Sequence, residues 1–255
     1  MIAMIRIGLL GCGNVGHVLA KYPADIRITA VYDIIRARAE EIAAATGARV
    51  CTQFEDFITG DFDLVVEAAS VQAVAEYAEE ILRRGKDLVI LSVGALSDHA
   101  FYAQLEETAR AAGKRVYIPS GAIIGLDNLK IGQITDITRL TLKTTKNPAS
   151  LGIRADTKML VFRGTAHDCI REFPKNINVA VALELAAGRQ AEVELWVDPA
   201  VDRNIHEIVA EGAFGEIEIR VRNTPSPENP ATSYLAALSI ITLLRNLERP
   251  ISVGT

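Results

Sequence analysis

Residues 6–16 read RIGLLGCGNVG and decide the fold of the N-terminal half. A short apolar run ends in Gly11, Gly13 and Gly16, which gives the spacing GxGxxG directly after an expected strand. In this arrangement Gly11 permits a tight turn, Gly13 lets the backbone approach a pyrophosphate, and Gly16 lets the next helix pack on the strand. The start of that helix offers free N–H groups and the positive end of its dipole to phosphate. The stretch therefore predicts a dinucleotide-binding turn.

The sequence around this turn alternates short apolar runs with helical patterns. Strands rich in Val, Ile and Leu are expected at residues 6–10, 28–33, 63–68, 87–93 and 115–118. An amphipathic helix is expected between Ser70, its N-cap, and Gly85, and a second over residues 98–112. This alternation is typical of a doubly wound parallel sheet of the Rossmann type.

From about residue 121 the spacing of apolar residues changes from a helical period to a period of two residues. Residues 192–197 and 216–222 alternate apolar and charged side chains, which predicts a sheet with one wet face and mainly antiparallel pairing. A further strand is expected at 140–145, a helix at 176–187 and a helical segment at 233–247. The fold class is therefore α/β, with an N-terminal Rossmann domain and a second α+β domain carrying this sheet.

Composition limits the possible partners of the chain. Its 255 residues are 49% hydrophobic and 23% charged, with a net charge of -5, and no basic run offers phosphate contacts, so we expect no nucleic-acid partner. No stretch approaches about 18 apolar residues, and the N-terminus reads as a strand, so neither a membrane span nor an export signal is expected. The three cysteines lack CxxC spacing, which favours a reducing compartment, the cytoplasm.

Asp33 follows Gly16 by 17 residues and ends the second expected strand. An acidic side chain there accepts hydrogen bonds from the adenosine ribose and repels a 2′-phosphate, which favours NAD. Arg36 could pair with a 2′-phosphate, so NADP remains an alternative. A glycine turn with an acidic cap and no ligand is the purely structural interpretation.

Four histidines are candidates for proton transfer near neutral pH. His17, His99 and His167 lie on or beside expected helices or turns, where surface and capping roles are more common. His206 lies in DRNIHEIV at a loop-to-strand junction of the second domain. Acidic and amide side chains that could orient its imidazole are Asp202, Asn204 and Glu207.

Lys175 in FPKNINVA precedes an expected helix, where the helix dipole disfavours a cation unless a carboxylate or other anion binds there. It is therefore a candidate partner for an anionic substrate, although a solvated lysine fits the local sequence equally well. Asp198, Asp202 and His206 match no compact metal-ligand spacing, and we expect no metal site.

Five motifs together resemble the L-aspartate dehydrogenase family over nearly the whole chain. They are GCGNVG at 11–16, PSGAIIGLDNLK at 119–130, FPKNINVA at 173–180, NIHEI at 204–208 and NTPSPENPATSYLAALS at 223–239. The resemblance implies a Rossmann domain at 1–120, completed by the C-terminal helix 226–255. It also implies an α+β substrate and dimerisation domain at 121–225, and hence a homodimer.

The resemblance also implies roles for single residues. His206 matches the family's catalytic histidine, Ala122 and Asn176 match positions that contact the cofactor, and Asn178 is their neighbour. Ile124 departs from the family pattern, where a second glycine is expected in the turn beneath the nicotinamide. The candidate cofactor-binding residues are Gly11, Gly13, Asn14, Val15, Gly16, Asp33, Ala69, Ser70, Ala122, Asn176 and Asn178. The candidate substrate-binding residues are Ser120, Lys175 and His206, the last two also as catalytic residues.

The reaction implied is the NAD(P)-dependent, reversible oxidation of L-aspartate to iminoaspartate, which water hydrolyses to oxaloacetate and ammonia. The imine could instead supply NAD biosynthesis. Two alternatives share the architecture: a dehydrogenase or reductase of another small carboxylate, like homoserine dehydrogenase or dihydrodipicolinate reductase, and a non-catalytic NAD(H) sensor.

Overall fold

The computed structural model describes residues 4–24, 26–173, 178–227, 229–251 and 253–254. The chain divides into two compact units, the first comprising Met1–Pro119 and Ala236–Val253 and the second Ser120–Leu235 and Gly254–Thr255. Within the described residues, no helix is both long and apolar enough to cross a membrane.

The first unit is built on a six-stranded sheet of order β3-β2-β1-β4-β5-β6, and every pairing is parallel. Its strands are β1 (Ile5–Leu10), β2 (Ile26–Tyr32), β3 (Arg49–Cys51), β4 (Leu64–Glu67), β5 (Asp87–Ile90) and β6 (Val116–Tyr117). The order reverses between β1 and β4, which is the switch point where doubly wound folds bind nucleotides. The predicted Rossmann fold is therefore confirmed.

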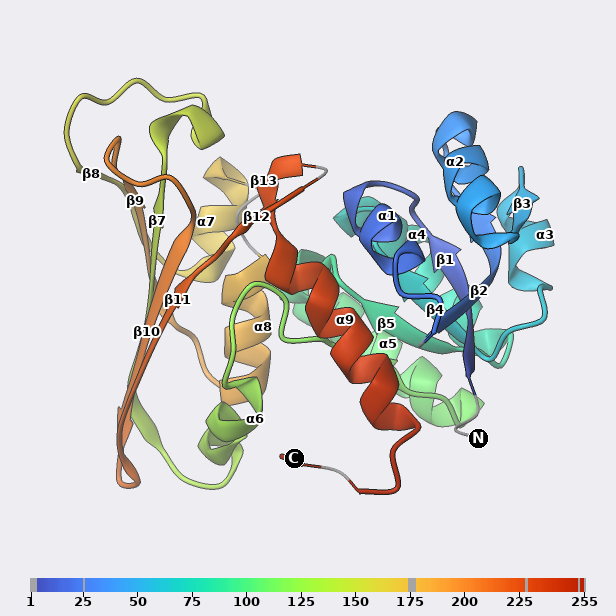
Figure 1. The fold of residues 1–255 in the computed structure, drawn as a ribbon. Coiled ribbons are helices and arrows are strands. Elements are labelled where there is room, and N and C mark those ends of the chain that lie inside the picture. The colour runs from blue at the N-terminus through green and yellow to red at the C-terminus, as the bar shows by residue number, and fades with distance from the viewer. Residues whose placement is uncertain (1–3, 25, 174–177, 228, 252, 255) are drawn as a thin grey trace. The chain divides into compact units, whose positions relative to one another are not determined.

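The helices of the first unit bury apolar side chains, and α4 and α5 begin at side-chain caps. They are α1 (Asn14–Ala20), α2 (Arg36–Thr46), α3 (Phe54–Ile58), α4 (Val71–Arg83), the 3₁₀ turn η1 (Val93–Ser97), α5 (His99–Ala112) and most of α9 (Tyr234–Leu247). The Ser70 side chain caps α4 by accepting the Ala73 N–H, and the Asp98 side chain caps α5. The C-terminal α9, red in Figure 1, belongs to this unit from Ala236 onward.

The second unit contains a mixed sheet of order β11-β10-β7-β9-β8. Its strands are β7 (Ile137–Lys146), β8 (Met159–Gly164), β9 (Glu192–Val197), β10 (Ile205–Gly212) and β11 (Gly215–Arg222). Three of its pairings are antiparallel and one, β7 with β9, is parallel. The prediction of a mainly antiparallel sheet is confirmed, and the parallel pair arises because the connection from β7 runs through β8 and two helices.

Helices cover one side of this sheet, as Figure 1 shows for α6, α7 and α8. The remaining elements of the unit are α6 (Leu126–Leu129), η2 (Lys130–Gln133), η3 (Pro148–Leu151), α7 (Ala166–Glu172), α8 (Asn178–Ala187), β12 (Pro225–Ser226) and β13 (Asn229–Ser233). The core between helices and sheet includes Leu142, Leu183, Leu195 and Ile208, each at most 1% exposed. The alternating residues of β9 and β11 face away from this core, as their sequence period predicts.

Candidate active site

The glycine turn between β1 and α1 has the shape that its spacing predicts. Gly11 has φ +95°, and a Cβ there would lie 2.7 Å from the backbone of Ala68. A Cβ on Gly13 would meet nothing within 4 Å, so this side of the turn is open. A Cβ on Gly16 would lie 3.1 Å from the Leu9 side chain, so the glycine lets α1 approach the strand. These are the three properties of a turn that cradles a pyrophosphate, and the residues therefore fit a dinucleotide.

Asp33 follows β2 and joins it to the glycine turn. One carboxylate oxygen accepts the Cys12 N–H at 2.7 Å, and the other accepts the Ile35 N–H at 2.7 Å. Burial, and to a smaller extent Asp33, raises the pKa of the Cys12 thiol to about 12, so this thiol is neutral and not a nucleophile. Arg36, the candidate for a 2′-phosphate, is paired with Glu40 at 2.7 Å along α2.

Four predicted cofactor-binding residues line one groove of about 220 Å³ in the first unit: Gly11, Asp33, Ala69 and Ser70. The groove is completed by Leu10, Tyr32, Ile34, Gln72, Ala73, Glu76 and Tyr77. Asn14 and Val15 lie in the first turn of α1, and Val15 is only 7% exposed, so its backbone is the part available to a ligand.

A buried carboxylate that no sequence motif indicates fixes the loops after β4 and β5. Glu67 ends β4 and is 1% exposed. One of its oxygens accepts the Ala69 N–H, the Ser70 N–H and the Ser92 hydroxyl at 2.7, 3.0 and 2.9 Å. The other accepts the Leu91 and Ser92 N–H groups at 3.2 and 3.0 Å. Burial raises the pKa of Glu67, and the bonds from Ser92, Ala69 and Ser70 oppose that rise. The amides of Ala69 and Ser70 are thus engaged by Glu67.

His206 is the second residue of β10 and is 5% exposed. Its Nδ1 shares a hydrogen bond with the Thr144 hydroxyl at 3.0 Å, across the β10–β7 register. Burial, and then the nearby charge of Lys146, lowers the pKa of His206 to about 3. The imidazole is therefore neutral at physiological pH, and Nε2 is the nitrogen left for proton exchange.

The prediction that Asp202 and Glu207 orient His206 is wrong. The Asp202 side chain binds its neighbour Arg203 at 2.7 Å, and Glu207, which alternates to the opposite face of β10, pairs with Lys143 at 3.1 Å. Thr144 takes the orienting role instead. It lies 62 residues earlier in the chain, and only the register of β7 against β10 brings it to His206.

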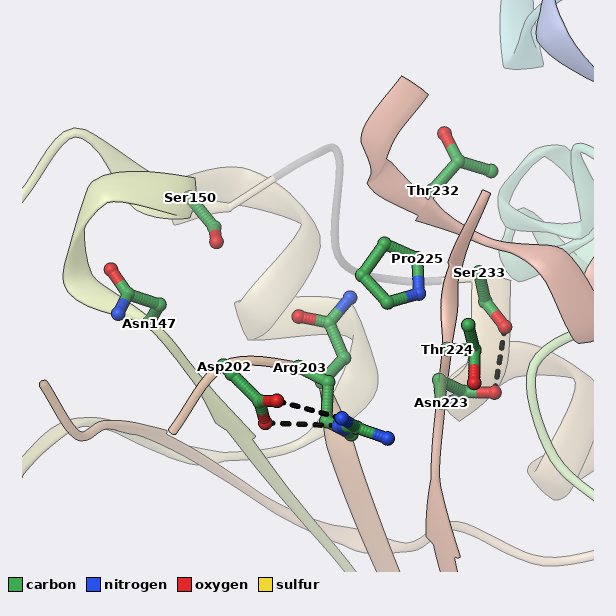
Figure 2. A pocket seen from close by; sticks show the side chains of 10 residues that line it. Asn147, Ser150, Asp202, Arg203, Asn223, Thr224, Pro225, Thr232 and Ser233 are labelled. Carbon is green, nitrogen blue, oxygen red and sulfur yellow. Dashed lines mark hydrogen bonds and ion pairs between the residues drawn. The ribbon is translucent and has the colours of Figure 1, made fainter. Parts of the chain in front are cut away.

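Asn223 connects three segments of the second unit. Its side-chain NH₂ donates to the Ala122 carbonyl at 2.9 Å, and its oxygen accepts the Ser233 hydroxyl at 2.6 Å. Its backbone N–H donates to the carbonyl of Asn204, two residues before His206. Figure 2 shows Asn223, Ser233 and the Asp202–Arg203 pair around a small polar pocket. The turn that carries Ala122 is thereby tied to the strand that carries His206.

Other predicted residues of the second unit are placed as follows. Ser120 accepts the Ile123 N–H at 3.3 Å through its carbonyl, within the turn that contains Ala122. Ile124 is 52% exposed, and Asn178 begins α8. Lys175 and Asn176 lie outside the described residues.

The other three histidines have structural positions. His17 contacts the Gly13 carbonyl at 2.9 Å and Glu41 at 3.2 Å. His99 begins α5, and His167 lies in α7, whose N-terminus is closed by a capping box, rather than in the expected turn.

Comparison with known proteins identifies the family. A family model described as "Aspartate dehydrogenase, C-terminal" matches residues 127–247, and one described as "Homoserine dehydrogenase, NAD binding domain" matches residues 8–119. An L-aspartate dehydrogenase of Methanospirillum hungatei is 56% identical over 99% of this chain and 100% of its own length. This chain belongs to the L-aspartate dehydrogenase family. It is therefore an NAD(P)-dependent oxidoreductase with a nicotinamide cofactor.

Other members of the family and more distant folds agree. An L-aspartate dehydrogenase of Archaeoglobus fulgidus is 43% identical over 97% of this chain and 99% of its own. The crystal structure of aspartate dehydrogenase from Thermotoga maritima matches with a TM-score of 0.83 and 32% identity, covering 99% of this chain and 100% of that one. A homoserine dehydrogenase from Thiobacillus denitrificans, at 15% identity and a TM-score of 0.61 over 95% of this chain and 74% of its own, shares the fold alone.

Proposed function

We propose that this protein catalyses the NAD(P)-dependent oxidation of L-aspartate to iminoaspartate, which water converts to oxaloacetate and ammonia, in a reversible reaction. The full-length identity to L-aspartate dehydrogenases carries the proposal. When bound, the nicotinamide supplies the acceptor for the hydride from Cα. The chain must bind two carboxylates, orient Cα and move the protons released from nitrogen and water.

His206 is the proposed general acid/base. Its neutral imidazole can accept a proton at Nε2 in the oxidative direction and return it in the reductive direction. Thr144 holds Nδ1 at 3.0 Å and so fixes the plane of the ring. If H206A kept the full kcat/KM of the wild type for L-aspartate while binding NADH normally, this role would be wrong.

NAD is the proposed preferred cofactor. The supporting observation is that Asp33 lines the groove that also contains Gly11, Ala69 and Ser70, and Arg36 does not. A carboxylate at this position accepts ribose hydroxyls and repels a 2′-phosphate. The comparison to make is kcat/KM with NAD and with NADP, and a preference for NADP would contradict the assignment.

The remaining substrate and cofactor contacts are proposals by family resemblance. Ser120 and Lys175 would bind substrate, with Lys175 also aiding catalysis, and Ala122, Asn176 and Asn178 would contact the cofactor. The hydrogen bond from Asn223 to the Ala122 carbonyl supports a fixed turn at that position.

One assay separates this function from its rivals. NADH formation is followed with L-aspartate and with L-homoserine, using NAD and NADP in turn. Turnover of L-homoserine alone would favour a homoserine dehydrogenase. Binding of NADH without turnover of either amino acid, or of oxaloacetate with ammonia, would indicate a sensor and end the proposal.

The assembly and cellular role are also proposals. A homodimer is supported by the sheet face opposite α6–α8, where half-exposed Trp196 lies beside Leu160, 38% exposed. Light scattering that gives the mass of one chain would refute it. The three cysteines are free and buried, which supports a reducing cytoplasm, and iminoaspartate that escapes hydrolysis could serve NAD biosynthesis.

A further inference from the structure

Lys146 is the last residue of β7 and shares a face of the sheet with the catalytic candidate. The register places His206 opposite Thr144, and Lys146 is two residues further along β7. Because alternate residues of a strand point to the same face, Thr144, Lys146 and His206 lie together on the face that packs against the helices. A lysine is an unusual choice for that face, whose other members include Leu142 and Leu195.

The charge of Lys146 affects the pKa values of the groups around it. Burial lowers the pKa of Lys146 to about 8, and the same ammonium contributes to the depressed pKa of His206. On α7, burial and then Glu172 raise the pKa of the Cys169 thiol to about 11, against the influence of Lys146. The thiol is therefore neutral at physiological pH.

These surroundings favour an incoming anion. The lowered pKa of Lys146 means that its surroundings disfavour the charged form of the side chain. A carboxylate placed beside the ammonium attracts it and offsets the free-energy cost of keeping it charged. Ionisable groups with perturbed pKa values of this kind are concentrated at functional sites. The neighbouring ring nitrogen of His206 is the proton acceptor of the proposed reaction, so an anion held here lies beside the reacting group.

We propose that Lys146 is a substrate-binding residue whose ammonium takes one carboxylate of the dicarboxylic substrate next to His206. This inference rests on the proposed oxidation of L-aspartate. After burial, Lys146 also contributes to keeping the imidazole uncharged.

Lys143 provides a matched control on the same strand. It alternates to the opposite face, pairs with Glu207 at 3.1 Å and lies 5.9 Å from the centre of the Trp196 ring. Removing its charge deletes a lysine three residues away without touching the face that carries His206.

The test compares K146M, K146R and K143M with the wild type, using succinate as a competitive dicarboxylate probe. In K146M we expect the inhibition constant of succinate to rise and kcat/KM for L-aspartate to fall, each by about 100-fold, the usual effect of removing one partner of a buried ion pair. The dissociation constant of NADH stays within about twofold. K146R recovers part of the succinate affinity, and K143M resembles the wild type.

A thermal melt separates this role from a merely structural one. Because partial burial disfavours the ammonium, K146M is expected to melt at the same temperature as the wild type or higher. Succinate inhibition unchanged in K146M would overturn the proposal, as would an equal loss in K143M. If K146M does not fold, K146Q is measured in the same way.

Failure of the proposed function has a different signature. Wild-type protein that binds NADH but does not turn over L-aspartate contradicts the function. Lys146 is then tested by calorimetric titration of succinate into wild type and K146M, where equal affinities would exclude the anion site.

Discussion

Replacing Glu67 by glutamine tests whether one buried carboxylate organises the loops after β4 and β5. The two oxygens of Glu67 accept five hydrogen bonds, three at one oxygen and two at the other. The amide of glutamine has only one accepting oxygen. Whichever way it is oriented, its NH₂ group faces at least two donors of the loops.

The magnitude follows from the groups left without an acceptor. In the less costly orientation the NH₂ replaces the oxygen that accepts from Leu91 and Ser92. The Leu91 N–H retains its bond to the Glu67 backbone carbonyl at 3.2 Å, but the Ser92 N–H loses its acceptor and faces the donor NH₂ instead. At about 1–3 kcal/mol for each unsatisfied buried group, E67Q should cost about 3 kcal/mol, or roughly 6–12 °C in Tm.

The assays are a thermal melt and a fluorescence titration with NADH. Since Ala69 and Ser70 line the groove of the first unit, loosening their loop should also weaken NADH binding by roughly tenfold. E107Q, the same substitution on the exposed face of α5, serves as control and should change neither value. A Tm of E67Q within about 2 °C of the wild type would refute the reasoning, because it is below the effect of one lost buried hydrogen bond.

Three further predictions concern the cofactor site and His206. G13A should melt like the wild type, since its Cβ meets nothing within 4 Å, yet bind NADH at least about tenfold more weakly in a fluorescence titration. D33S should lower kcat/KM for NAD more than for NADP in steady-state assays, and an equal loss would contradict the ribose contact. The folded pKa of His206 is below its unfolded value, so its contribution to stability is present above pH 6.5 and is lost as the pH falls toward 3. Urea unfolding should therefore show H206N gaining roughly 3 kcal/mol relative to the wild type between pH 7 and 4.5, and a constant difference would contradict the buried neutral imidazole.

The sequence predicted those features that depend on residues close together along the chain. The glycine turn, Asp33 and the N-cap of α4 are local, because each acts on backbone within a few residues or on the adjacent strand. The strand β3, of three residues, was too short to give a period. The expected strand at 87–93 ends at Ile90, since its last residues turn into η1.

What the sequence could not predict depends on register between distant strands. Thr144 and Lys146 were not recognised because nothing in the segment 140–146 indicates which face meets His206. Glu67 was an acidic residue at the end of a strand, and only the packing of β4 beside β5 gives it donors from Ser92, 25 residues away. The motif NTPSPENP at 223–230 contributes to the family resemblance. The structural role of its first residue, Asn223, depends on hydrogen bonds to Ala122 and Ser233, which the sequence does not show.

Glu67 is buried and Lys146 is half-buried, and the opposite effects expected on removing them distinguish two uses of an ionisable group within a fold. Glu67 is surrounded by five donors that need an acceptor, so its loss leaves buried N–H groups unsatisfied and lowers stability. Burial disfavours the ammonium of Lys146, so replacing this residue should not lower the stability of the fold and should instead weaken substrate binding. A substitution at Glu67 should therefore impair activity through stability and cofactor affinity, whereas one at Lys146 should impair substrate affinity in a protein that is at least as stable. Measuring both Tm and the affinity for succinate in the variants of Glu67 and Lys146 thus distinguishes the two roles.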